Sequence, residues 1–280
     1  MRQINVEKIT KETARLCQEA CYDLPLDVVK AIKNAAATER SPLGQNVLNK
    51  LLENANLASR ERMPCCHDTG LAVVFVEIGQ DIHLTGGSLR EAISEGVRKG
   101  YQEGFLRKSV VGDPLERINT GDNTPAIIHT DIVEGDSIKI TVVPKGGGSE
   151  NMSALEFLLP GDGPEGVKKF VLDTVIKAGG KACPPLVVGV GLGGTFDHVA
   201  YLAKKALLRE IGIYNPHPHL ASLEIELLTL INKTGIGPQG LGGTNTALWV
   251  AVEAFATHIT ALPVAVNLQC HAARRKSCTI

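Results

Sequence analysis

The sequence predicts an α+β fold in which mixed sheets, including an antiparallel hairpin, are flanked by helices. Three observations support this prediction: helical periodicity through the first sixty residues, runs rich in β-branched residues after it, and two neighbouring runs with an alternating pattern. Glycine clusters lie between elements rather than between blocks of different composition. We therefore expect one domain over residues 1–280.

Each element is predicted from its own local pattern. Pro25 and Pro42 mark helix starts, because proline fits the first helical turn. Strands are rich in Val and Ile and end near glycine, as at Gly79. The predicted elements are helices at 4–18, 26–37 and 43–59, a strand at 71–78, a helix at 88–106, strands at 126–133 and 138–143, a helix at 163–178, a strand at 186–190, helices at 196–211 and 221–233, and a strand at 264–268.

The strands at 126–133 and 138–143 are joined by a short connection, Glu134 to Ser137. This spacing predicts that the two strands pair directly as a hairpin. An antiparallel pair argues against a purely parallel sheet.

Charge and hydropathy exclude several classes of function. Lys plus Arg number 29 against 30 for Asp plus Glu, so the net charge of -1 gives no electrostatic case for nucleic acid or an anionic membrane. No stretch approaches the roughly 18 uninterrupted apolar residues of a membrane span, and the N-terminus resembles an amphipathic helix rather than a signal peptide. We expect a cytoplasmic protein.

Seven cysteines in such a chain do not indicate a disulfide framework, because a large core needs no crosslinks. Cys17 and Cys21 are spaced i, i+4 on the first helix and are interpreted as packing residues. Cys278 is expected to be a frayed terminal thiol.

Cys66, Cys183 and Cys270 each stand where a loop meets a predicted strand. Three thiolates that converged at one point would make a soft-metal site with an open coordination position. No CxxC spacing and no fourth ligand are evident, which argues against a zinc scaffold and against a redox carrier cluster. On spacing alone, ordinary buried thiols are the favoured explanation.

Other candidate residues each have a structural alternative. Asp68 can move a proton beside a metal, or it can cap the turn at Thr69-Gly70. Residues 145–149 can cradle an anion or form a flexible turn. His258, on a predicted apolar helix, fits the core or a pocket. Three arginines (Arg107, Arg274 and Arg275) can bind a carboxylate or stay solvated.

The run Gly189-Val-Gly191-Leu-Gly-Gly194 matches the pattern of a dinucleotide-binding loop after a strand. The next segment, Gly212-Ile-Tyr-Asn-Pro, does not resemble the second strand of such a fold. Dinucleotide binding is therefore kept only as a distant alternative.

Together these segments resemble class I iron–sulfur fumarate hydratases, in particular the alpha subunit of the two-subunit form, with tartrate dehydratase alpha subunits as close relatives. The resemblance runs over nearly the whole chain. It is carried by the runs that begin at Cys66 (CHDTG), Asn123 (NTPA), Lys145 (KGGGSEN), Ala182 (ACPP), Gly193 (GGT), Gly237 (GPQGLGG) and Pro263 (PVAVNLQCHAAR).

The resemblance implies that Cys66, Cys183 and Cys270 hold a [4Fe-4S] cluster whose open iron binds the substrate. It implies an acid/base role for Asp68. Substrate contacts are implied for Arg107, His258 and the backbone around Gly147. His67 stands at a further substrate-binding position, where the family usually has glutamine, and Thr244-Asn245 replaces a common lysine and threonine.

The resemblance also implies a partner and a substrate class. The catalytic base and further arginines of the family lie in a beta subunit, so we expect a complex of α2β2 type that is inactive without it. The expected substrate is a small dicarboxylate: fumarate, hydrated to (S)-malate, with L-tartrate as the alternative and methylated analogues not distinguished. A non-catalytic iron–sulfur protein is a more distant alternative.

Overall fold

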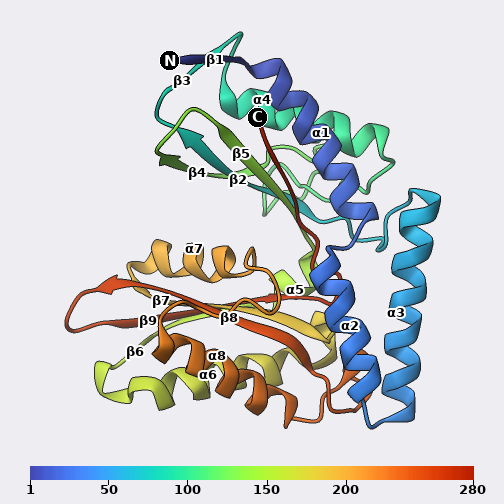
Figure 1. Cartoon of the computed structure of the whole chain (residues 1–280), viewed down its shortest axis with the longest axis vertical. Helices are drawn as coiled ribbons and strands as arrows, with labels where there is room; N and C mark the ends of the chain where they lie inside the picture. Colours follow the sequence, from blue (N-terminus) through green and yellow to red (C-terminus); the bar gives the residue numbers. More distant parts are fainter. The chain divides into compact units, whose positions relative to one another are not determined.

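A computed structural model of the protein describes all 280 residues and divides the chain into two units. Unit 1 comprises Met1–Pro25, Asn54–Gly147 and Arg274–Ile280, and unit 2 comprises Leu26–Glu53 and Gly148–Ala273. Helices and mixed sheets occur in both units, which confirms the α+β class (Figure 1). The prediction of one domain over residues 1–280 stays a prediction. No helix combines the length and the apolar character needed to span a membrane.

Unit 1 is built on a four-stranded sheet with the order β10-β5-β2-β4. β2 (Leu71–Gly79) takes an inner position because five consecutive residues, Ala72 to Val76, are buried, as expected of a strand covered on both faces. The other strands are β4 (Ile127–Val133), β5 (Ile138–Lys145) and β10 (Lys276–Thr279). β10 was not predicted, and it places Cys278 opposite Ile140 in a strand rather than at a frayed end.

The predicted hairpin is wrong in its pairing. β4 and β5 are joined by the short connection that the sequence indicates, but β2 lies between them and bonds to both. β4 pairs with β2 in parallel, and β5 pairs with β2 antiparallel. Burial distinguishes the two strands: β2, the inner strand, has five consecutive buried residues, whereas β4, at the edge, keeps several exposed residues.

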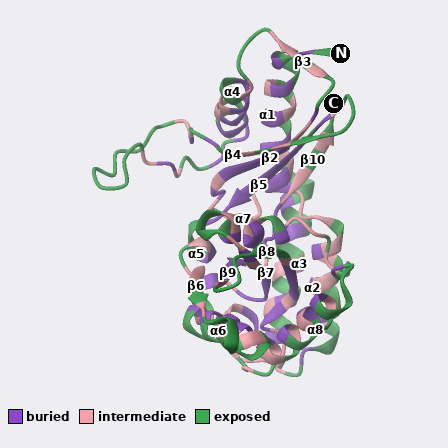
Figure 2. Ribbon diagram, turned by 90° about the vertical axis from the view of Figure 1, so that its left-hand side faces the viewer, coloured by how far each residue is buried: buried purple, intermediate pink, exposed green.

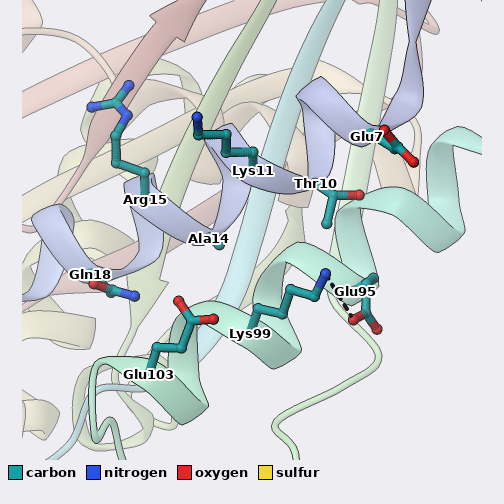
Figure 3. A pocket seen from close by; sticks show the side chains of 9 residues that line it. All are labelled: Glu7, Thr10, Lys11, Ala14, Arg15, Gln18, Glu95, Lys99 and Glu103. Carbon is teal, nitrogen blue, oxygen red and sulfur yellow. Dashed lines mark ion pairs between the residues drawn. The ribbon is translucent and has the colours of Figure 1, made fainter.

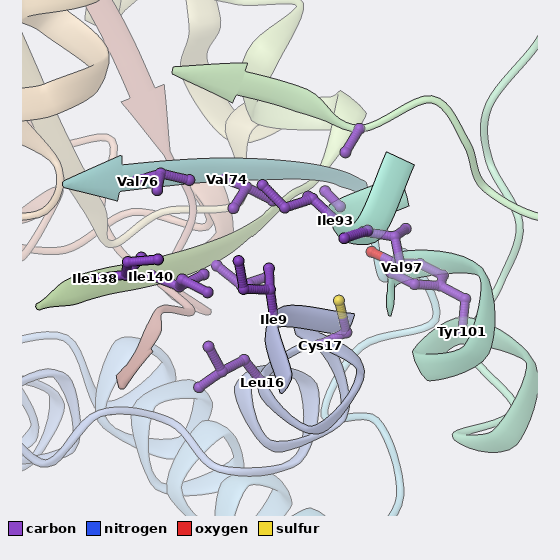
Figure 4. Close-up of a cluster of buried hydrophobic side chains, with 14 of the residues drawn as sticks. Ile9, Leu16, Cys17, Val74, Val76, Ile93, Val97, Tyr101, Ile138 and Ile140 are labelled. Carbon is purple, nitrogen blue, oxygen red and sulfur yellow. The ribbon is translucent and has the colours of Figure 1, made fainter. Parts of the chain in front are cut away.

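Two helices cover one face of this sheet. α1 (Val6–Tyr22) and α4 (Leu89–Glu103) insert apolar side chains between alternate residues of β2 and β5 (Figure 4). Burying each such side chain contributes about 1.5–3 kcal/mol. A small parallel pair, β1 (Arg2–Asn5) with β3 (Ile82–Thr85), was not predicted. The labelled core residues in Figure 4 are Ile9, Leu16, Cys17, Val74, Val76, Ile93, Val97, Tyr101, Ile138 and Ile140.

Unit 2 has a second four-stranded sheet, with the order β6-β9-β7-β8 and helices on both faces (Figure 1). Its strands are β6 (Ala154–Leu158), β7 (Leu186–Gly194), β8 (Ala247–Thr257) and β9 (Leu262–Gln269). α6 (Gly163–Ala178) and α8 (Pro218–Asn232) pack on one face, and α7 (Phe196–Ala206) packs on the other. The remaining helices are α2 (Leu26–Thr38), the four-residue α5 (Gly147–Glu150) and α3 (Pro42–Glu61), which begins in unit 2 and ends in unit 1.

Two glycines of the Gly189–Gly194 run have a packing role. A Cβ at Gly189 would lie 2.1 Å from the carbonyl oxygen of Ala203, and one at Gly191 would lie 2.2 Å from that of Val199, both on α7. The run therefore lies within β7 and lets α7 approach the sheet closely. This removes the basis of the dinucleotide-binding interpretation.

A buried carboxylate fixes the glycine-rich loop that precedes β8. Glu39 is only 2% exposed and accepts hydrogen bonds from the backbone of Ser41, Thr244 and Asn245, and from the Asn245 side chain. Burial alone would raise the pKa of this carboxyl, but the hydrogen bonds outweigh burial and lower it to about 2. The ionised carboxylate thus ties the end of α2 to the loop.

We expect Glu39→Gln to lower the free energy of unfolding by about 2–3 kcal/mol at pH 7, because it removes charge-assisted hydrogen bonds from a buried site. The folded pKa lies below the unfolded value of 4.5, so the contribution is complete above pH 4.5 and is lost as the pH falls towards 2. Urea unfolding should therefore show a smaller gap between variant and wild type at pH 3 than at pH 7. Glu53→Gln, at an exposed carboxylate, serves as the control. An equal gap at both pH values would contradict this account.

Candidate functional site

The loop that carries Cys66, His67 and Asp68 ends at the first residue of β2 and is held by Asp68. One carboxylate oxygen of Asp68 accepts from the Gly70 amide at 3.0 Å, and the other accepts from the Gly147 amide at 2.8 Å. The Asp68 carbonyl accepts from Nη2 of Arg274 at 2.8 Å, and Arg274 is only 2% exposed. The carboxylate therefore has a fixed orientation, and Arg274 is a buried structural residue of this loop rather than a solvated arginine.

Strand register explains why Asp68 and Gly147 meet. Leu71 of β2 is opposite Lys145 of β5, so the residues before β2 lie beside those after β5. Gly70 has a φ of +72°, and a Cβ there would lie 2.4 Å from the Lys145 carbonyl oxygen. Only glycine permits this turn and this close approach.

Two further residues hold the loop, and sequence reasoning missed their role. The Tyr101 hydroxyl donates to the carbonyls of Thr69 and Gly70 at 2.9 and 3.1 Å, and burial raises its pKa so that it stays protonated. The Asn123 side chain is fully buried and donates to the Gly70 carbonyl at 3.2 Å. A signal for Asn123 was present, since it opens one of the runs that carry the family resemblance.

Arg107 lies next to the same loop. The Arg107 carbonyl accepts a hydrogen bond from the Thr69 hydroxyl at 3.1 Å, and the Arg107 residue is exposed. His67 is also exposed, while Cys66 and Asp68 are half-buried. Unit 1 thus brings together four of the predicted site residues, with Gly147 bonded to Asp68 as the fifth. Because the Gly147 amide already binds Asp68, its predicted role as a substrate donor stays a prediction.

The cysteines of unit 1 fall into two kinds. Cys17 and Cys21 are fully buried on α1, and burial raises the pKa of Cys21 to about 12. This confirms their interpretation as packing residues. Cys65 and Cys66 are half-buried in the loop, where the Cys65 amide donates to the Cys21 carbonyl at 3.0 Å.

Cys183 and Cys270 lie at the same end of the sheet of unit 2. Val187 of β7 is opposite Gln269 of β9, and both cysteines stand just outside this pair. The Cys183 carbonyl accepts from the His271 amide at 3.2 Å, which ties the two segments together. Cys183 has a left-handed backbone, with a φ of 53°, a conformation that non-glycine residues adopt rarely and often at functional sites.

Gln239 supports this cysteine pair from the glycine-rich loop. Its side-chain amide donates to the Pro184 carbonyl at 2.9 Å and lies 3.1 Å from Nδ1 of His271. Gln239 belongs to the run at Gly237 that carries the resemblance, but sequence reasoning gave it no role.

The three candidate cysteines have the donor chemistry that an iron–sulfur group needs. Neither unit by itself contains three His, Cys, Asp or Glu side chains grouped to hold a metal ion. Cys66 belongs to unit 1, and Cys183 and Cys270 belong to unit 2. All three are half-buried thiols at loop-to-strand junctions, the soft and accessible donors that such a group requires.

His258 does not lie on the predicted helix. The apolar run before it forms β8, and His258 is exposed in the connection to β9, where Nδ1 lies 2.8 Å from the Thr260 hydroxyl. The helix prediction was wrong because a short apolar run has no decisive period, and pairing with β7 selects a strand. β9 separates His258 from Cys270 by a strand length of about 26 Å.

A recess of about 640 Å³ between α1 and α4 contains none of the predicted site residues (Figure 3). Of its charged side chains, Arg15 is paired with Glu12 and Glu19, and Lys99 is paired with Glu95. The Asp68 loop does not line this recess.

We expect Gly70→Ala to destabilise unit 1 by roughly 3 kcal/mol or more, because it combines a positive φ with a backbone clash. Gly121→Ala is the matched control, since Gly121 has a φ of +79° and a Cβ added there would meet nothing within 4 Å. That control should lose only about 1 kcal/mol. Thermal unfolding of both variants measures the difference, and equal losses would show that the Lys145 contact is unimportant.

Comparison with known proteins agrees with this arrangement of motifs. The family model described as Fumarate hydratase (Fumerase) matches residues 10–279. A protein of Methanocaldococcus jannaschii named "Putative L(+)-tartrate dehydratase subunit alpha" is 46% identical over 274 residues, which cover 96% of each chain. The "L(+)-tartrate dehydratase subunit alpha" of Escherichia coli strain K12 is 34% identical over 278 residues, covering 98% of this chain and 91% of that protein. The chain belongs to the fumarate hydratase (Fumerase) family.

Proposed function

We propose that the chain is the alpha subunit of a [4Fe-4S]-dependent hydro-lyase that adds water to, or removes it from, a four-carbon dicarboxylate. The observation that carries the proposal is the fixed carboxylate of Asp68, two residues after Cys66, in a loop with Arg107 beside it. Family membership supports the reaction class.

Cys66, Cys183 and Cys270 are the proposed cluster ligands. The assignment of Cys183 and Cys270 as ligands is supported by their position at the same end of the unit 2 sheet. The assignment of Cys66 is supported by its position beside Asp68. A cluster bound by three cysteines keeps one iron open, and this iron would act as a Lewis acid on the substrate's C–O bond.

The chain's own residues would then handle protons and charge. Asp68, whose carboxylate accepts from two backbone amides, would exchange a proton with the leaving hydroxyl. Arg107 is exposed and would bind a substrate carboxylate through two hydrogen bonds. The negative charge on this carboxylate grows as the C–H bond breaks. His67 is the proposed contact in place of the usual amide, while roles for the Gly147 backbone and for His258 carry less structural support.

Fumarate and L-tartrate are the two candidate substrates. Fumarate is proposed first from the name of the matching family, and L-tartrate is favoured by the printed names of the similar proteins. L-Tartrate carries one hydroxyl group more than (S)-malate, the hydration product of fumarate, and His67 beside Cys66 is proposed as a side chain that would contact this extra group. Both substrates must therefore be assayed.

A beta subunit is the proposed partner, because the similar proteins are named as alpha subunits while matching this chain over almost their full length. The beta subunit would supply the catalytic base and further cationic contacts, in a complex of proposed α2β2 type. On this proposal the active enzyme needs both chains.

We expect Cys66→Ser, Cys183→Ser and Cys270→Ser each to abolish the visible absorption of a cluster assembled anaerobically on the chain. Cys65→Ser is a matched control, because Cys65 is an adjacent half-buried thiol, and Cys17→Ser is a buried control. Both controls should keep the absorption. Absorption that survives all three of the first substitutions would remove these residues as ligands.

We expect the chain with its cluster to turn over poorly alone, and to hydrate fumarate or dehydrate L-tartrate when co-purified anaerobically with the beta subunit. Asp68→Asn in that complex should lower kcat by about 10²–10⁴-fold with the cluster absorption retained, because a proton-transfer group is lost. Initial rates on both substrates provide the measurement. Efficient turnover by the isolated chain would contradict the need for a partner.

A further inference from the structure

β4 forms an open edge of the unit 1 sheet. It bonds only to β2, with Val133 opposite Gly79, and the Val133 carbonyl accepts from the Gln80 amide at 2.8 Å. In a parallel pair of strands, every second residue directs both its N–H and its C=O group towards the neighbouring strand. Val133 and the residues at 127, 129 and 131 therefore face β2, whereas Ile128, Thr130 and Ile132 point their N–H and C=O groups out of the sheet.

This edge lacks most of the features that normally prevent pairing with another strand, and Asp131 is its single charged residue. Five of the seven residues in Ile127–Val133 are β-branched, and the segment contains no proline, no lysine and no register shift against β2. Ile132 is 76% exposed and Ile127 is 46% exposed. A regular and apolar edge of this kind pairs readily with a further strand.

We propose that β4 pairs antiparallel with β4 of a second copy of this chain, across a two-fold axis at Thr130. The three outward residues of each strand supply three N–H and three C=O groups, so this register forms six backbone hydrogen bonds. The two sheets then join into one continuous sheet. The inference is independent of the proposed reaction and gives a location for the contact between two alpha chains.

The side chains in this register are self-complementary. Ile128 faces Ile132 of the second copy, Ile127 faces its Val133, and Thr130 faces its Thr130. His129 faces Asp131 of the second copy, so no like charges oppose each other. Such β-branched and Thr–Thr pairs each contribute favourably across antiparallel strands. A strand of unrelated sequence would need to reproduce this order, which is why a second copy is the favoured occupant.

A second observation points to the same side of unit 1. The connection between α4 and β4 extends away from the sheet on the side where β4 lies (Figure 2). It is ordered by its own hydrogen bonds, including Gly112 amide to Ile118 carbonyl at 2.8 Å, yet Leu115 is 90% exposed and Ile118 is 69% exposed. An ordered arm with apolar residues at its tip is suited to lie against a neighbouring chain.

Sedimentation or light scattering of the full chain should give a dimer, with twice the mass of the 29.8 kDa chain, at micromolar concentration. Thr130→Lys should raise the dissociation constant at least about 100-fold, because two lysines then face each other at the axis. Thr130→Pro should act similarly, since it removes an outward N–H without touching the bonds to β2. Thr279→Lys is the matched control, as the same substitution at an exposed position of β10, the opposite edge strand.

Hydrogen exchange provides an independent measurement. The amides of Ile128, Thr130 and Ile132 should be protected in the wild type and exchange rapidly in Thr130→Lys, with the far-UV circular dichroism spectrum unchanged. A monomeric wild type, or variants that dimerise as the wild type does, would overturn the proposal. Should the chain be monomeric alone and Thr130→Lys instead weaken capture of a co-expressed beta subunit, the edge would belong to that subunit.

Discussion

The position of β2 between β5 and β4 is the constraint on which the other features of unit 1 depend. Five consecutive buried residues make β2 an inner strand, and its antiparallel register with β5 places the residue before Leu71 beside the residue after Lys145. That register allows Asp68 to accept a hydrogen bond from Gly147. The same position leaves β4 with one neighbour and therefore with an open edge.

The Asp68 loop is held by hydrogen bonds to its backbone carbonyls and to the Asp68 carboxylate. Tyr101, Asn123 and Arg274 donate to the carbonyls of Asp68 to Gly70, and none of these three is exposed. Buried donors of this kind are costly to leave unsatisfied, so the loop and its supports are stable only together. A carboxylate used in proton transfer benefits from such an arrangement, because its orientation needs no adjustment during the reaction.

Sequence periodicity predicted which segments are helices and strands better than it predicted how strands pair. Long amphipathic helices such as α1 and α3 were found close to the predicted positions. The hairpin failed because connection length indicates which strands are neighbours in sequence, whereas the burial of β2 decides which are neighbours in the sheet. β8 failed because the apolar run before His258 fits a helix and a strand equally until pairing with β7 is known.

Candidate site residues could be predicted from sequence where the chemistry of the side chain indicates a role. They could not be predicted where the role depends on a contact in the folded chain. Asp68 and the cysteines could be chosen from their chemistry, while the supporting roles of Tyr101, Gln239 and Arg274 depend on hydrogen bonds that no spacing reveals. The structural interpretation of Asp68 is confirmed, because one carboxylate oxygen accepts from the Gly70 amide and the other from the Gly147 amide. The acid/base role stays a proposal, and these two hydrogen bonds would give the carboxylate the fixed orientation that the role needs. A loop Asp that caps its own turn can therefore still be a catalytic candidate when its second oxygen is held by a different segment, as Gly147 of α5 holds that of Asp68.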